Sequence, residues 1–161
     1  MIKIQKDLHE AHEARKTKQI KQAFSYRKKL PSEVTEVYYL YAINKTTDYP
    51  KSTKDSGKWL IFVPNSEIDE TWILVKEATE NGLLGGQSKV STMKKNPIAK
   101  NDNQKIICVY TYDWNDSEDV MRIREHLRRL GFTQKLPYKT DYDTMMKKYV
   151  WKGDNCFKFF K

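Results

Sequence analysis

Two lysines lie inside segments that otherwise have the composition of β-strands. Lys89 lies within residues 87–93, and Lys139 lies within residues 138–142. Burying an unpaired ammonium group is costly, so each lysine needs either a carboxylate or an anionic ligand. If both side chains point to one open face of a sheet, they can clamp a phosphate group between them.

Two carboxylates provide a structural alternative to this clamp. Asp113 and Asp141 lie at the ends of neighbouring strand-like segments, where they can form ion pairs with Lys89 and Lys139. The sequence leaves both hypotheses open.

Further polar and aromatic side chains can complete a nucleotide site. Arg122 or Arg124 can add a bidentate contact to phosphate. Tyrosines such as Tyr110 can stack against a base, and Trp114 is predicted to be an exposed stacking residue in a loop. The ligand-binding residues predicted in this way are Lys58, Lys89, Ser91, Tyr110, Tyr112, Asp113, Trp114, Arg122, Tyr138, Lys139 and Asp141.

Signatures of enzymes and of metal sites are weak in this chain. It has no P-loop and no dinucleotide-binding fingerprint, and His9 and His12 lack the i,i+4 spacing of a zinc-binding helix. An enzyme that eliminates phosphate from a phosphoamino acid would need a base such as Lys89 or Lys139 with a lowered pKa. We therefore favour binding over catalysis and expect no catalytic residue, no metal and no cofactor.

The positive charge is concentrated at the start of the chain. The 161 residues include 30 Lys and Arg against 21 Asp and Glu, a net charge of +9. Residues 1–30 hold nine basic and three acidic side chains, a net of +6. Such a segment favours a polyanion, above all nucleic acid. The alternative is a solvated lysine-rich helix with no partner.

Cysteine content and hydropathy bear on the cellular location. The two cysteines, Cys108 and Cys156, form no disulfide framework, and Cys108 has the surroundings of a buried apolar residue. No segment approaches 18 apolar residues, and no apolar signal-peptide core follows the N-terminus. These features predict a cytoplasmic protein without a membrane partner.

Hydrophobic periodicity predicts the elements that must position these residues. Helices are predicted over 7–29, 66–81 and 116–130. Strands are predicted over 34–43, 58–63, 87–93, 105–113 and 138–142, with 149–151 and 157–160 as candidates for the last one or two. The order after the basic helix is ββαββαββ, which predicts an α+β fold with a curved antiparallel sheet. We expect helices on its convex face and an open concave face, in a single domain over 31–161 preceded by a basic helical arm over 1–30.

Local signals predict the core and the helix ends. Trp59 in an apolar strand and Trp72 on a helical stripe are expected in the core. Ser66 with Asp69 resembles a capping box, and Asp116 or Ser117 is expected to cap the following helix.

Short pieces of the chain resemble the basophilic leukaemia-expressed protein family. They span roughly residues 57–145, and none is found in the first 30 residues. The pieces are Lys58-Trp59-Leu60, the helix around Trp72, Gly85, Lys89-Val90, Thr92, Ile107-Cys108-Val109-Tyr110-Thr111, Asp113, Asp119-Val120, Arg122, Leu130-Gly131, Tyr138-Lys139 and Asp141.

This resemblance implies a fold like that of the eukaryotic cap-binding translation initiation factor. It agrees with the order of elements derived from periodicity. The function of the family is not established, although some members carry the label phosphothreonine lyase. Cap-binding factors hold a methylated guanine between two tryptophans, and no such pair is identified here.

These observations predict non-catalytic binding of a phosphate-bearing ligand on the concave face of the sheet. A nucleotide, a cyclic or linear oligonucleotide, or an RNA end has the required chemistry. The alternatives are a phosphothreonine-lyase-like enzyme acting on phosphoprotein, and a module that binds a protein partner through its basic arm. The oligomeric state is left open.

Overall fold

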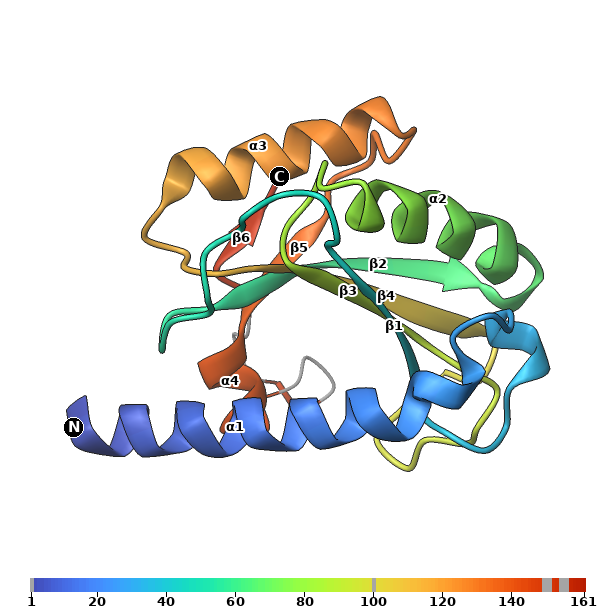
Figure 1. Cartoon of the computed structure of the whole chain (residues 1–161), viewed down its shortest axis with the longest axis horizontal. Helices are drawn as coiled ribbons and strands as arrows, with labels where there is room; N and C mark the ends of the chain where they lie inside the picture. The colour runs from blue at the N-terminus through green and yellow to red at the C-terminus, as the bar shows by residue number, and fades with distance from the viewer. Residues whose placement is uncertain (1, 100, 149–151, 154–156) are drawn as a thin grey trace.

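A computed structural model describes residues 2–99, 101–148, 152–153 and 157–161, which form an antiparallel sheet with helices on both faces (Figure 1). In the described residues the sheet has six strands in the order β1-β3-β4-β2-β5-β6. The strands are β1 (Tyr39–Ile43), β2 (Gly57–Pro64), β3 (Gln87–Ser91), β4 (Gln104–Thr111), β5 (Pro137–Thr140) and β6 (Phe159–Phe160). The helices are α1 (Ile2–Ala23), α2 (Ile68–Glu80), α3 (Ser117–Arg129) and α4 (Asp141–Met145), and short 3-10 turns lie at Phe24–Tyr26, Pro31–Glu33 and Asn65–Glu67.

Helices α2 and α3 cover the convex face of the sheet, as the sequence predicts (Figure 1). Apolar side chains at helical spacing on α3, such as Val120 and Ile123, are fully buried against the strands. Trp59 and Trp72 are both buried in this main core, which confirms their prediction as core residues. The side chain of Asp116 caps α3 by accepting a hydrogen bond from the backbone N–H of Asp119.

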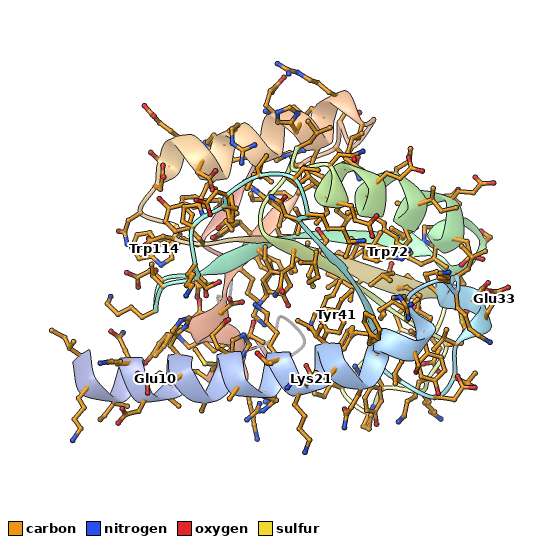
Figure 2. The ribbon with its side chains drawn as sticks, viewed as in Figure 1. Glu10, Lys21, Glu33, Tyr41, Trp72 and Trp114 are labelled. Atoms are coloured by element: carbon orange, nitrogen blue, oxygen red, sulfur yellow. The ribbon has the colours of Figure 1, made fainter. Side chains whose placement is uncertain are left out.

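The concave face is covered by helix α1, so the expectation of an open face is wrong. Figure 1 shows α1, in blue, running beneath the sheet on the side opposite α2 and α3, with α4 between α1 and the sheet. Side chains fill the layer between them (Figure 2). The hydroxyl of Tyr41 on β1 reaches α1 and donates a hydrogen bond to Gln19 at 3.2 Å.

Several element boundaries differ from the prediction for local reasons. Strand β5 ends at Thr140, because the Thr140 hydroxyl accepts a hydrogen bond from the Asp143 backbone and so begins α4. The predicted Ser66–Asp69 capping box is absent, because the Asp69 carboxylate accepts hydrogen bonds from Ser32 instead. The candidate strand over residues 149–151 lies outside the described residues.

None of the helices in the described ranges combines the length and the hydrophobicity that a bilayer crossing requires.

Candidate anion-binding site

Neighbouring strands bring three lysines together on the concave face. Lys58 of β2 lies opposite Tyr110 of β4 on one side and opposite Lys139 of β5 on the other. Residues directly opposite in an antiparallel pair project to the same face. Lys89 of β3 pairs with Cys108, two residues from Tyr110, so its side chain shares this face. Lys89 and Lys139 therefore project to the same face, which is the condition that the clamp hypothesis sets.

Helix α1 adds a fourth lysine from the other side of this layer. Lys16 is only 5% exposed, and its Nζ lies 3.9 Å from the centroid of the Tyr110 ring. The same Nζ lies 3.5 Å from Oε1 of Glu13. We call Lys16, Lys58, Lys89 and Lys139 the lysine cluster.

A buried carboxylate neutralises part of the cluster. Asp141 is fully buried at the start of α4, and its Oδ1 lies 2.7 Å from Nζ of Lys58. Ser56 Oγ donates a 2.6 Å hydrogen bond to the other oxygen, and Lys58 also donates to Thr144 Oγ1 at 2.6 Å. Asp141 therefore pairs with Lys58 rather than with Lys139, the partner that the sequence suggests.

The field of the cluster keeps Asp141 ionised. Burial alone would raise the pKa of Asp141, but the positive charges of Lys58 and Lys16 outweigh it. The pKa of this carboxyl is therefore well below its ordinary range. A buried carboxylate with such a pKa reports strong local positive potential.

Lys89 lies at the centre of the layer with an aromatic neighbour. Its Nζ lies 3.9 Å from the centroid of the Tyr39 ring. Within the described residues, this Nζ makes no hydrogen bond and no salt bridge. Burial lowers the pKa of Lys89 to about 8, and the charges of Lys58 and Lys16 also lower it. The ammonium form is thus retained at neutral pH, at a cost in hydration.

His12 on α1 also faces the cluster, in neutral form. Its Nε2 lies 4.0 Å from Oδ2 of Asp141, which is too long for a hydrogen bond. Burial lowers the pKa of His12 to about 4, although the Asp141 carboxylate opposes this shift. His12 Nε2 and Glu13 Oε1 are both buried without a hydrogen-bond partner in the described part of the chain.

The described residues of this layer carry more positive than negative charge. Among the described residues, the ammonium groups of Lys16, Lys58 and Lys89 lie near two carboxylates, those of Asp141 and Glu13. Lys139 donates a hydrogen bond to the Lys148 carbonyl. No group of three or more His, Cys, Asp or Glu side chains in the described ranges is placed to hold a metal ion. The chemistry of this layer is therefore that of an anion site.

Two predicted residues on the strands have other environments. Ser91 accepts a hydrogen bond from the Ile106 backbone at 2.9 Å, at the far end of β3. Tyr138 points to the opposite face from Lys139, because side chains alternate along a strand. Its ring packs edge-on against Trp59 at 5.1 Å, and its hydroxyl bonds Thr111, so Tyr138 belongs to the main core.

Three predicted residues follow the end of β4, outside the cluster. Tyr112 donates a hydrogen bond to the Asp116 carboxylate at 2.5 Å. The Asp113 carboxylate accepts from Thr53 at 2.8 Å, so it does not pair with Lys89. Trp114 is half-buried, and the Nζ of Lys158 lies 3.6 Å from its ring centroid.

Arg122 lies on α3, on the convex side of the sheet from the cluster. It donates hydrogen bonds to the carbonyls of Leu83 and Leu84 and pairs with Asp119 at 2.9 Å. Arg124 is buried and donates to three backbone carbonyls. Both arginines therefore fasten loops to α3 and do not face the cluster.

The residues that sequence reasoning missed come mainly from α1. The basic helix was expected to be a separate arm, so its polar side chains were not placed near the strands. A signal was nevertheless present: His9, His12, Lys16 and Gln19 recur at three- and four-residue spacing, which places them on one helical face. All four contact the sheet side of the molecule.

Comparison with known proteins gives a family match over nearly the whole chain. A family model described as basophilic leukemia-expressed protein Bles03 matches residues 2–146. The match includes α1, so the expectation that the first 30 residues lie outside the resemblance is wrong. It also covers all members of the lysine cluster.

Solved structures show the same fold. Schistosome eIF4E, in a complex with m7GpppA and 4E-BP, is 14% identical, with a TM-score of 0.58 over 88% of this chain and 81% of that chain. C. elegans eIF4E-3, in a complex with the 4E-binding protein Mextli and a cap analog, is 18% identical over 67% of this chain, with a TM-score of 0.48. The match spans 65% of that chain, less than two thirds of its length. At such identities the likeness concerns the fold alone. The schistosome structure, with its TM-score of 0.58, is the one that shows it.

Proposed function

The chain belongs to the basophilic leukemia-expressed protein Bles03 family, and from this premise we propose that it binds a phosphate-bearing ligand at the lysine cluster. The ligand is bound on the concave face, beneath α1, without being chemically changed. The observation that carries the proposal is the position of Lys89, whose Nζ lies 3.9 Å from the Tyr39 ring and has no hydrogen bond or salt bridge to any described residue, next to Lys58 and Lys16.

The energetic argument rests on Lys89. A lysine kept for structure alone is expected to pair with a carboxylate, because an uncompensated buried charge is strongly destabilising. Asp141 forms an ion pair with Lys58, and Glu13 forms one with Lys16. Among the described residues, the Nζ of Lys89 makes no ion pair with a carboxylate and lies 3.9 Å from the Tyr39 ring and 6.0 Å from the Tyr110 ring. A phosphate oxygen at this position would restore hydrogen bonding to the ammonium and offset its lost hydration.

The fold supports a nucleotide-like ligand, and the tryptophans argue against a cap. The schistosome relative is described as a complex with m7GpppA, and a shared fold raises the prior for a similar ligand class without establishing it. Here, however, Trp59 and Trp72 are buried in the core and cannot sandwich a methylated base. Of the other two tryptophans, Trp114 has Lys158 over its ring, and Trp151 lies outside the described residues. We therefore propose a phosphate ligand held by lysines, without the tryptophan pair of a cap site.

Elimination of phosphate from a phosphothreonine peptide is a second candidate, favoured by one observation. Lys89, with its pKa lowered to about 8, has the basicity of a group that removes an α-proton. The electron pair of that C–H bond would form the alkene as the Cβ–O bond breaks and phosphate leaves. His12, with a pKa near 4, is a poor proton donor to the leaving phosphate at neutral pH, which ranks this candidate second. Incubating the protein with a phosphothreonine peptide and weighing the product by mass spectrometry tests it.

The binding proposal is tested on the purified full chain. The ratio of absorbance at 260 and 280 nm, followed by mass spectrometry of material released on denaturation, detects a bound nucleotide. Isothermal titration with pyrophosphate then measures binding to ligand-free protein. We expect either a released phosphate compound or a saturable heat of pyrophosphate binding. A protein with neither would contradict the proposal.

A further inference from the structure

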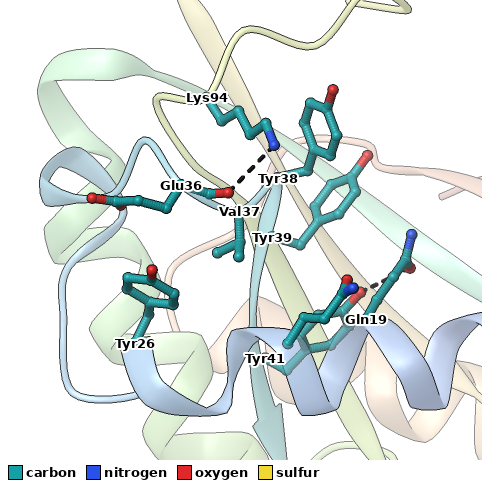
Figure 3. Close-up of a pocket in the computed structure, with 9 residues that line it drawn as sticks. Gln19, Tyr26, Glu36, Val37, Tyr38, Tyr39, Tyr41 and Lys94 are labelled. Carbon is teal, nitrogen blue, oxygen red and sulfur yellow. Dashed lines mark hydrogen bonds between the residues drawn. The ribbon is translucent and has the colours of Figure 1, made fainter.

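A cavity lined by tyrosines lies beside the lysine cluster. It has a volume of about 450 Å³ and lies between the C-terminal half of α1, strand β1 and the segment that carries Lys94 (Figure 3). Tyr26, Tyr38, Tyr39 and Tyr41 contribute four aromatic side chains to its wall. Cavities of this size are typical of small-molecule sites.

Two wall residues connect the cavity to the cluster. The ring of Tyr39 lies under Nζ of Lys89 at 3.9 Å. Tyr41 is paired with Lys89 in the β1–β3 register, so the two side chains lie next to each other on the concave face. An aromatic surface and the least compensated ammonium group of the cluster are therefore in direct contact.

The cavity also gives access to a layer that is otherwise closed. Lys58 and Lys139 are buried, and α1 covers the cluster from below. In contrast, Tyr38 on the cavity wall is 39% exposed, and Glu36 beside it is exposed as well. A ligand that reaches Lys89 from solvent would thus pass along the tyrosine wall.

Polar groups on the same wall suit a heterocycle with hydrogen-bonding edges. Gln19 and Gln22 of α1 line the cavity, and an amide side chain both donates and accepts hydrogen bonds. Lys94 donates to the Glu36 carbonyl, which fixes the outer rim (Figure 3). Aromatic rings accept any base by stacking, whereas the amides can read its edge.

From these contacts we infer that the tyrosine cavity takes the base of a mononucleotide whose phosphate lies on Lys89. The inference rests on the proposed phosphate binding and narrows its ligand class. A single nucleotide fits this arrangement better than a polymer, because the rest of the lysine cluster is enclosed by α1 and α4.

Titration calorimetry on the full chain tests the inference with three kinds of probe. These are inorganic phosphate, a nucleoside without phosphate, and 5′-AMP or 5′-GMP. We expect the mononucleotide to bind about tenfold or more tighter than phosphate, since stacking of a base on an aromatic ring has this magnitude. The nucleoside alone is expected to bind more weakly than the mononucleotide.

Variants then locate the base. Tyr39→Leu is expected to abolish the advantage of the mononucleotide over inorganic phosphate. The ratio of the two affinities is the readout, because Tyr39 also contacts Lys89 and its replacement acts on both affinities. Phe62→Leu is the matched control. Phe62 on β2 is an exposed aromatic residue on the same face of the sheet as Tyr39, and it does not line the cavity. If Tyr39→Leu does not fold, as judged by circular dichroism, the more exposed Tyr38→Leu replaces it.

The outcomes separate the two proposals. If phosphate and mononucleotide bind equally well, or if neither tyrosine variant changes their ratio, the cavity does not hold the base although the phosphate site stands. If neither probe binds, the lysine cluster is not a phosphate site and both proposals fail.

Discussion

Nζ of Lys58 lies 2.7 Å from Oδ1 of Asp141, and both side chains are buried beneath α1 although 83 residues separate them in the chain. The pair joins the centre of the sheet to the first residue of α4. It also places the only fully buried carboxylate of the described residues within a group of lysines. The proposed anion site therefore shares Lys58 with a buried ion pair that stabilises the fold.

Replacement of Asp141 by asparagine is expected to destabilise the protein strongly. Removing one partner of a buried ion pair leaves the other charge uncompensated, which costs about 3–5 kcal/mol. Urea unfolding followed by circular dichroism measures the change. Asp143→Asn is the control, because Asp143 pairs with Lys148 at a partly exposed position and should lose less than about 1 kcal/mol. If both variants lose the same free energy of unfolding, the buried Lys58–Asp141 pair stabilises the protein no more than an exposed pair does.

Replacement of Lys89 by methionine is expected to separate binding from stability. The affinity for pyrophosphate should fall about tenfold or more, since a hydrogen bond to a charged group is lost. The free energy of unfolding should rise, because a partly buried cation that makes no ion pair with a described carboxylate is removed. Calorimetry and urea unfolding measure the two effects. Lys45→Met, at an exposed ion pair with Glu80, should change neither.

The stability of the protein is expected to fall as the pH decreases from about 6.5 to about 4, in part through His12. The folded state lowers the pKa of His12 from 6.5 to about 4. In this window the unfolded chain binds the proton and the folded chain does not, so protonation favours unfolding. His12→Gln should flatten this part of the curve of unfolding free energy against pH. His126→Gln on α3 is the comparison variant: burial and the charges of Arg122 and Arg129 also lower the pKa of His126, so it should change the curve in the same direction. If the unfolding free energy of His12→Gln depends on pH between 6.5 and 4 as strongly as that of the original protein, the pKa of His12 is not lowered in the folded state.

Arg122→Ala is expected to affect stability and not ligand binding. Arg122 donates to the carbonyls of Leu83 and Leu84 on the convex side, remote from the lysine cluster. Loss of these hydrogen bonds should lower the free energy of unfolding by about 1 kcal/mol. The affinity for pyrophosphate should be unchanged. A weaker affinity in this variant would place Arg122 at the ligand, as the sequence first suggested.

Periodicity was sufficient to predict the sheet and its convex layer. Strand and helix patterns depend on neighbouring residues, so the order ββαββαβ as far as β5, the core positions of Trp59 and Trp72 and a cap at Asp116 or Ser117 could be predicted from the sequence. Helix α4, which lies between β5 and β6, was not predicted. Alternation along a strand placed Lys89 and Lys139 only within their own strands, and the pairing of the strands then brought both to one face.

Only the tertiary structure decided which helices and side chains contact these lysines. Helix α1 has no strong apolar stripe, and the polar residues on one of its faces do not by themselves show that this face packs on the sheet; its contacts there are largely polar. The partner of Lys58 depends on where Thr140 ends β5 and turns Asp141 into α4. Charge pairing and burial arise between segments far apart in the chain, and single-sequence patterns carry no information on such distances. The amino-acid sequence therefore determined the sheet and the lysines on it, and long-range packing determined that they form an enclosed cluster.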